Sequence, residues 1–100
     1  MEFNTRLVGV SFKGRQENLP KVVPDQELFW KHEADSRWDP NSVLVYADAE
    51  MTLELGHLNR RIAKNVVRRM QEGVAQKIFV NKVTGDAYPR RYGLNVRLVF

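Results

Sequence analysis

Short apolar stretches separated by turn residues predict about six β-strands. The stretches are five to ten residues long and rich in Val, Leu, Phe and Tyr, which is typical of strands that are buried on at least one face. In the last stretch apolar residues alternate with polar ones, which indicates a strand with one face toward solvent. The predicted strands cover residues 5–13, 26–34, 42–47, 51–55, 74–83 and 94–100.

One segment has the spacing of an amphipathic helix, over about residues 59–72. Asn59 is a good N-cap residue, and Gly73 stands where a helix-terminating glycine belongs. A short helical turn is expected near residues 15–23, where Pro20 limits any longer helix. The apolar stripe of the main helix consists of Ile62, Ala63, Val66, Val67 and Met70.

These elements predict a single domain over residues 1–100 that is mainly β. A small OB-like antiparallel β-barrel with one main helix fits best, because closing the sheet removes its exposed edges. No apolar run approaches the roughly 20 residues needed to cross a bilayer. The first residues lack the apolar core of a signal peptide, and there is no cysteine. We therefore expect a cytoplasmic protein, nucleoid-associated if bacterial, with no membrane partner.

The net charge of +4 is unevenly distributed along the chain. Residues 1–50 carry six Lys or Arg and nine Asp or Glu, whereas residues 51–100 carry ten and three, so the halves differ as −3 and +7. The second half is a candidate footprint for a polyanion such as nucleic acid. Many small basic domains bind nothing acidic, so charge alone leaves both interpretations open.

The polar turn before the predicted strand 42–47 contains a tryptophan. Asp39 and Asn41 can hydrogen-bond their own backbone, and Pro40 fixes a turn value of φ. Trp38 has little chance of being covered by these neighbours, so it either folds back onto the core or is displayed for a partner. Asp39 beside this ring would repel a phosphate but could accept a hydrogen bond from a hydroxyl or a base amine. Trp38 and Asp39 together therefore favour binding of the end of a nucleic-acid strand, or of a base edge, over binding along a sugar–phosphate backbone.

Aromatic residues also stand beside basic ones elsewhere in the chain. Phe12 precedes Lys13, Arg37 precedes Trp38, and residues 88–92 read Tyr-Pro-Arg-Arg-Tyr. Aromatic faces can stack on unpaired bases while Lys and Arg follow the phosphates. Each aromatic residue taken alone is explained as well by a place in the core.

The start of the main helix is a second candidate contact. Arg60 and Arg61 oppose the helix dipole there, which a phosphate partner on the free N–H groups would offset. His57 could donate to the same phosphate. Ordinary solvated arginines and a structural histidine are the alternatives.

The sequence gives little support for an enzyme. His32 and His57 have no metal-binding spacing, and there is no glycine-rich phosphate loop. A hydrolase would need clustered carboxylates, and the second half supplies only Glu54, Glu72 and Asp86. We expect no catalytic residues, no metal and no cofactor.

Three motifs together resemble the HIRAN domain family. They are Val8-Gly9-Val10-Ser11-Phe12, residues 38–45 with the sequence Trp-Asp-Pro-Asn-Ser-Val-Leu-Val, and Gly56-His57-Leu58 before a helix. Their order and spacing match the family from about Leu7 to Phe100, as in a free-standing bacterial or phage-type member.

The resemblance implies a small OB-related β-barrel that binds DNA. A helicase-fused member of the family recognises the 3′-hydroxyl end of single-stranded DNA. By position, Phe12 and Trp38 would stack on bases, and Asp39 would accept from the terminal hydroxyl. His57 and Arg60 would lie near phosphates, whereas Ser11 replaces a basic residue of that relative.

The sequence therefore predicts a non-enzymatic module that binds single-stranded DNA at its 3′ end, in DNA repair or stalled-fork processing. The alternative is a protein–protein interaction domain that contacts replication or repair proteins, with Trp38 as an anchor. The residues predicted to bind DNA are Phe12, Lys13, Arg37, Trp38, Asp39, His57, Arg60 and Arg61.

Overall fold

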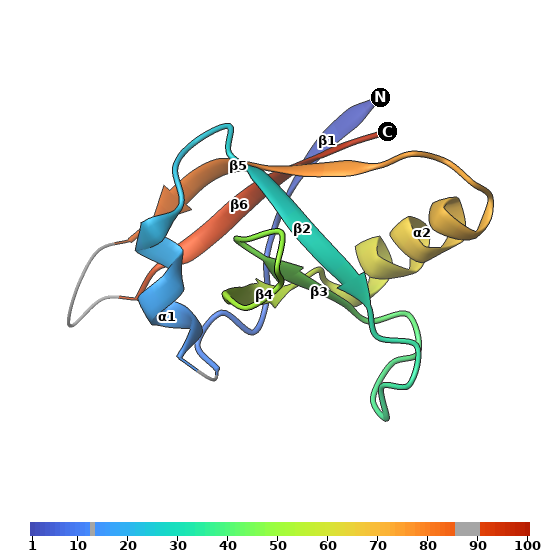
Figure 1. The fold of residues 1–100 in the computed structure, drawn as a ribbon, viewed down its shortest axis with the longest axis horizontal. Coiled ribbons are helices and arrows are strands. Elements are labelled where there is room, and N and C mark those ends of the chain that lie inside the picture. Colours follow the sequence, from blue (N-terminus) through green and yellow to red (C-terminus); the bar gives the residue numbers. More distant parts are fainter. Residues whose placement is uncertain (13, 86–90) are drawn as a thin grey trace.

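The protein is mainly β, with six antiparallel strands curled into a half-barrel and two short helices (Figure 1). The computed structural model describes residues 1–12, 14–85 and 91–100. The strand order in the sheet is β1-β6-β5-β2-β3-β4. The elements are β1 (Glu2–Arg6), α1 (Arg15–Asn18), a 3-10 turn η1 (Leu19–Lys21), β2 (Glu27–His32), β3 (Val43–Tyr46), β4 (Glu54–His57), α2 (Arg60–Gln71), β5 (Lys77–Thr84) and β6 (Gly93–Val99).

The curl of the sheet almost brings its two edges together. β1 and β4 are the edge strands, and the chain just after β1 reaches β4 through an isolated antiparallel bridge between Val8 and His57. The two backbone hydrogen bonds of this bridge are 2.8 and 2.9 Å long. Gly56 beside it has no room for a side chain, because a Cβ would lie 2.8 Å from the carbonyl oxygen of Val8. The predicted barrel is thus an open half-barrel joined by one bridge.

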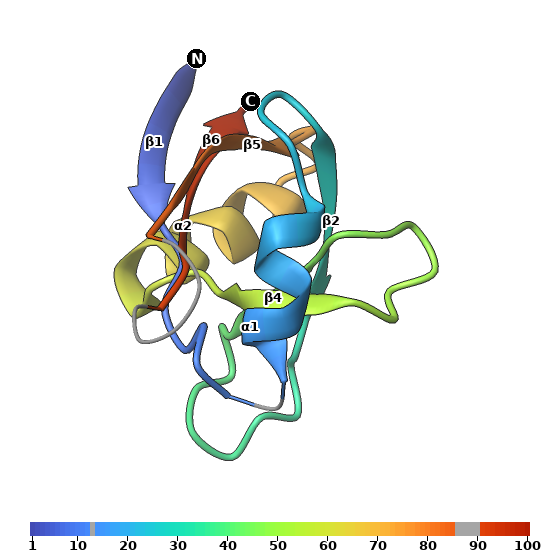
Figure 2. The ribbon, with the colours of Figure 1, turned by 90° about the vertical axis from the view of Figure 1, so that its left-hand side faces the viewer.

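One continuous apolar core fills the concave side of the sheet. All four residues of β3 are buried, and β5 and β6 contribute alternate residues such as Ile78 and Val96. α2 adds Ala63, Val66 and Val67 of its predicted stripe, and Ile62 packs against the core in part. Met70, the last member of the predicted stripe, is instead exposed. α1 and α2 lie at opposite ends of the curled sheet (Figures 1 and 2).

The main helix begins and ends as its sequence predicts. The Asn59 side chain accepts a 3.0 Å hydrogen bond from the amide of Ile62, which is an N-cap. Gly73 has φ +78°, and the amides of Gly73 and Val74 return to the carbonyls of Met70 and Arg69. These two bonds form a Schellman motif, which only a residue at positive φ completes at little cost.

The short helical turn predicted for residues 15–23 is confirmed by α1 and η1, with Leu19 and Val22 buried. The first strand was predicted at 5–13 and instead ends at Arg6. The reason is Gly9, whose φ of +66° turns the chain, and the amide of Phe12 returns to its carbonyl.

The fourth strand starts at Glu54 rather than at residue 51. The Asp48 side chain accepts from the amides of Thr52 and Leu53, which holds a loop over residues 47–53, wider than the connection 48–50 between the two predicted strands. β5 begins at Lys77 rather than at residue 74. The amide of Val74 bonds to the carbonyl of Arg69, and the Gln76 side chain donates to the carbonyl of Val66, so both residues are held by α2. Of the aromatic and basic segment 88–92, residues 88–90 lie outside the described residues.

Candidate nucleic-acid interface

A groove of about 490 Å³ opens between the loop after β1 and the loop that joins β2 to β3. Both loops project from the same lower edge of the molecule in Figures 1 and 2. The volume is in the usual range of roughly 300–1,000 Å³ for small-ligand sites. The residues that line the groove are Val8, Gly9, Phe12, Glu33, Ser36, Trp38, Asp39, Ser42 and His57.

Two aromatic rings flank the groove and are open to solvent. The side chain of Trp38 is 86% exposed and that of Phe12 is 63% exposed. Trp38 therefore does not fold back onto the core, which leaves the second of the two alternatives, display toward solvent. Burying an apolar side chain of this size gains roughly 1.5–3 kcal/mol, and the fold forgoes that gain twice here.

Hydrogen bonds within each loop hold the backbone that carries Phe12 or Trp38. Gly9 turns the chain so that Phe12 follows the turn, and the carbonyl of Phe12 accepts the amide of Arg15 at the start of α1 (2.9 Å). In the other loop the Ser36 hydroxyl accepts the amides of both Trp38 and Asp39, each at 3.3 Å. These bonds are short-range, so the sequence of each loop is sufficient to specify them.

Asp39 is at once a turn residue and a groove residue. Its Oδ1 accepts the amide of Asn41 at 2.9 Å, which is the turn-capping role expected from the sequence. Its Oδ2 faces the guanidinium of Arg60 at 3.5 Å. That ion pair is weak, because the Arg60 side chain is 80% exposed. The Asp39 side chain keeps 18% of its exposure and lines the groove, so its Oδ2 is a candidate acceptor for a ligand.

His57 sits in the groove wall with both ring nitrogens engaged by the protein. Its Nε2 lies 2.8 Å from Oε1 of Glu33, and its Nδ1 lies 3.3 Å from Nη1 of Arg15. Since a guanidinium can only donate, we assign the proton to Nε2, which then donates to Glu33. The structural alternative for His57 therefore accounts for both of its nitrogens.

Arg15 supports the hydrogen-bonded pair of His57 and Glu33. It is buried, and its guanidinium donates to the carbonyl of Gly9 (2.8 Å) and to the carboxylate of Glu54 (2.9 and 3.1 Å). These contacts tie α1, β4 and the turn at Gly9 into one rigid corner. The isolated Gly14-Arg15 pair gave no phosphate loop in the sequence, and the structure gives the arginine this positioning role instead.

Glu33 is the functional candidate that sequence reasoning missed. It is one polar residue of the predicted strand 26–34, and the pairing of β2 with β3 and of β3 with β4 brings it near His57. Burial alone would raise the pKa of the Glu33 carboxyl, but hydrogen bonds from His57 and Ser42 outweigh it and lower this pKa below its ordinary value. Glu33 is therefore ionised at neutral pH.

The predicted basic residues are only partly gathered at the groove. Arg60 reaches it, since Nη2 donates to the carbonyl of Trp38 at 3.2 Å. Arg61 and Arg37 are exposed but do not line the groove, and Lys13 lies outside the described residues. Among the described residues that line the groove, the charged side chains are two carboxylates, Glu33 and Asp39.

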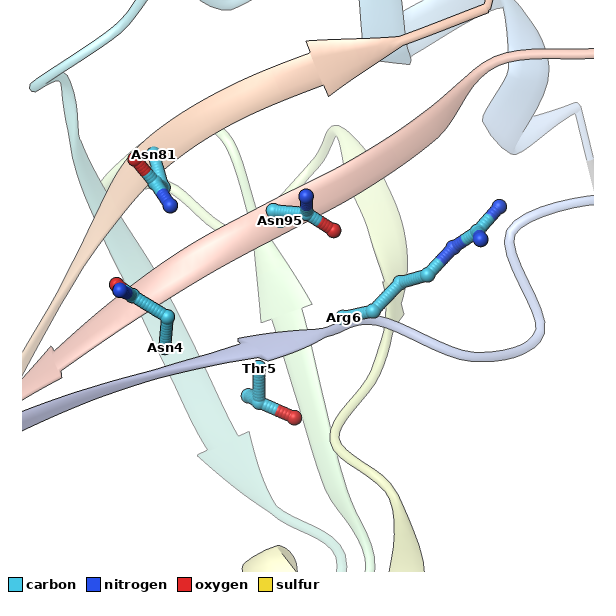
Figure 3. Close-up of a pocket in the computed structure, with 5 residues that line it drawn as sticks. All are labelled: Asn4, Thr5, Arg6, Asn81 and Asn95. Atoms are coloured by element: carbon cyan, nitrogen blue, oxygen red, sulfur yellow. The ribbon is translucent and has the colours of Figure 1, made fainter.

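A second, shallower hollow of about 220 Å³ lies over β1, β6 and β5. In Figure 3 the side chains of Asn4, Asn81 and Asn95 stand on one side of these strands, whereas Thr5 points the other way. Asn81 is the extra residue of a β-bulge between Val80 and Lys82. The hollow is polar and has no aromatic ring among its described lining residues, so it does not match the predicted site.

Among residues 1–12, 14–85 and 91–100, no group of three or more His, Cys, Asp or Glu side chains is placed to hold a metal ion. The helices in this part of the chain are too short and too polar for any of them to span a bilayer.

The fold is similar to that of a protein of known structure. A crystal structure of a protein from Lactobacillus plantarum, a structural genomics target, superposes with a TM-score of 0.61 and 16% sequence identity, over 100% of both chains. At this identity the similarity concerns the fold alone. No protein-family model matches the chain, and no curated protein matches it.

Proposed function

We propose that this chain is a HIRAN-like, non-enzymatic module that captures the 3′ end of single-stranded DNA in the groove. The observation that carries the proposal is the placement of two solvent-exposed rings, Phe12 and Trp38, at one groove with the carboxylate of Asp39. The rings offer stacking surfaces for unpaired bases, and Asp39 offers an acceptor for the terminal hydroxyl.

The start of α2 supports the same proposal. Its first-turn amides have no intrahelical acceptor, and Asn59 satisfies only that of Ile62. Arg60 stands there beside Trp38. A phosphate one nucleotide from the captured end would find these donors next to the groove. We accordingly place the protein where single-stranded DNA occurs, in the cytoplasm and at the nucleoid of a bacterium, in repair or stalled-fork processing.

The decisive experiment compares two labelled single strands of one sequence that differ only in a 3′-hydroxyl or a 3′-phosphate. We expect fluorescence anisotropy to show the hydroxyl end bound at least tenfold more tightly, because the groove wall carries two negative charges. Equal affinity for the two ends would reject the proposal.

Asp39→Asn tests the residue that reads the hydroxyl. Asparagine keeps an oxygen for the amide of Asn41, so the turn should persist, but the charged acceptor is lost. We expect the preference for the hydroxyl end to fall to about threefold or less. Asp35→Asn is the matched control, since Asp35 is an exposed residue of the same loop outside the groove lining, and it should leave the preference unchanged.

One observation favours a second candidate, a protein-interaction domain. The groove carries two carboxylates beside the exposed Trp38, which also suits a partner segment that presents a Lys or Arg next to an apolar pocket. If no oligonucleotide binds at low salt, and a replication or repair protein binds with loss of affinity in Trp38→Ala, this candidate replaces the first.

A further inference from the structure

We propose that the groove reads a terminal ribose through both of its hydroxyls, so that a strand ending in a ribonucleotide is preferred to one ending in a deoxyribonucleotide. This inference rests on the proposed function, because it assumes that a 3′ end occupies the groove. It adds Glu33 as a specificity residue beside Asp39.

The hydrogen-bonding groups of the groove favour a ligand that brings two donors. The two donors nearest Glu33 are used within the protein: the Ser42 hydroxyl and Nε2 of His57 donate to Oε1 of Glu33 at 2.9 and 2.8 Å. In the part of the chain that the structure describes, every side-chain bond to Glu33 ends on this one oxygen. Oε2 of Glu33 is left as an acceptor on a side chain that keeps 30% of its exposure.

Asp39, which lines the same groove, has a similar arrangement. Its Oδ1 accepts the amide of Asn41, and among the described side chains the partner of its Oδ2 is the solvent-exposed Arg60. The groove therefore offers two carboxylate oxygens, one from Glu33 and one from Asp39, and few uncommitted donors. A ligand complementary to it must bring two donors and no negative charge.

The 2′- and 3′-hydroxyls of a terminal ribose are such a pair of donors, on adjacent carbons. A deoxyribose end supplies one of them and leaves the second carboxylate without a partner. Recognition of the 2′-hydroxyl is also the general means by which proteins separate RNA from DNA. The rings of Phe12 and Trp38 can stack equally well on the base of a ribonucleotide or of a deoxyribonucleotide, so the sugar decides which end is preferred.

The fixed network behind the groove makes Glu33 suitable for this role. Arg15 is buried and holds Nδ1 of His57, which orients the ring so that Nε2 donates to Glu33. The carboxylate is thereby held in one position before a ligand arrives, which reduces the entropy lost on binding.

The test uses four labelled strands of one sequence. The strands are DNA with a 3′-hydroxyl, the same DNA with one 3′-terminal ribonucleotide, that strand with a 2′-O-methyl group, and DNA with a 3′-phosphate. The ribonucleotide end should bind roughly tenfold more tightly than the DNA end, as one hydrogen bond to a charged group allows. The 2′-O-methyl end should bind no better than the DNA end, because it keeps the ribose pucker but has no donor.

Glu33→Gln should reduce the preference for the ribonucleotide end to about twofold or less, while the preference for a 3′-hydroxyl over a 3′-phosphate persists through Asp39. Glu27→Gln is the control, since Glu27 is an exposed residue of β2 outside the groove lining, and it should change neither preference.

The possible failures are distinguishable. Equal affinity for ribonucleotide and deoxyribonucleotide ends, with the hydroxyl end still preferred to the phosphate end, overturns this inference and leaves the proposed function standing. Loss of both preferences overturns both. The 2′-O-methyl comparison uses the unaltered protein, so it decides the matter even if Glu33→Gln does not fold, and tight binding of that end would also overturn the inference.

Discussion

Trp38 shows at the scale of one residue how exposure can indicate function. Its indole is 86% exposed and sits on a loop whose amides are fixed by Ser36. A ring that supports no core packing can be removed with little effect on folding, but a ring that stacks on a base cannot be removed without loss of binding.

We therefore predict that Trp38→Ala weakens binding of single-stranded DNA roughly tenfold or more, as loss of one base stack at about 1–3 kcal/mol requires. The free energy of unfolding should change by less than about 0.5 kcal/mol. Anisotropy titration and urea unfolding measure the two quantities.

Two variants control for this result. Trp38→Phe keeps a stacking face and should retain most of the affinity. Val23→Ala removes another exposed apolar side chain, 59% exposed, that does not line the groove, and it should leave binding unchanged. Full affinity in Trp38→Ala would remove this ring from the site.

At the scale of elements, the site depends on one corner where α1, β4 and the loop after β1 meet. Arg15 holds the corner through the carbonyl of Gly9, the carboxylate of Glu54 and the ring of His57. The planar guanidinium of arginine makes these hydrogen bonds in a fixed geometry that the ammonium group of a lysine could not reproduce.

Arg15→Met should lower the free energy of unfolding by about 3 kcal/mol, because it leaves the carboxylate of Glu54 without its partner. We take the lower end of the usual range since the Glu54 side chain keeps 30% of its exposure. Urea unfolding followed by circular dichroism measures the loss. Lys21→Met, which removes a charge from an exposed residue of η1, should cost less than about 0.5 kcal/mol, and equal losses in the two variants would contradict the role of Arg15.

At the scale of the whole molecule, the described Lys and Arg side chains of residues 51–100 do not line the groove. α2 carries its exposed arginines along its length, and only Arg60 contacts the groove loops among the described residues of the helix. A strand held by its end then makes few phosphate contacts, so its binding should depend only weakly on salt.

For a single strand each phosphate contact contributes about −0.7 to the slope of log K against log salt, so we predict a slope of about −1 to −2. Arg60→Ala should reduce its magnitude by about 0.7. Titrations from low to moderate salt give these slopes. Arg68→Ala, on the exposed last turn of α2, is the control and should leave the slope unchanged; a slope steeper than about −4 would indicate binding along the backbone instead.

The sequence predicted the elements better than their boundaries. α2 was placed correctly because its cap, stripe and terminating glycine are local features. The first strand was extended too far because an apolar alternation around Gly9 does not reveal its positive φ. The fourth strand was placed too early because the side-chain bonds of Asp48 widen a loop whose sequence has no glycine.

The sequence by itself determined the mainly β fold class, the main helix, and the turn that carries Trp38 and Asp39. Each of these depends on periodicity or on hydrogen bonds between residues a few positions apart. Only the tertiary structure decided that the two exposed rings share one groove, that Glu33 and Asp39 both line it, and that Arg15 is buried in contact with His57. The curl of the sheet brings these residues together from segments far apart in the chain, and no local pattern encodes that curl.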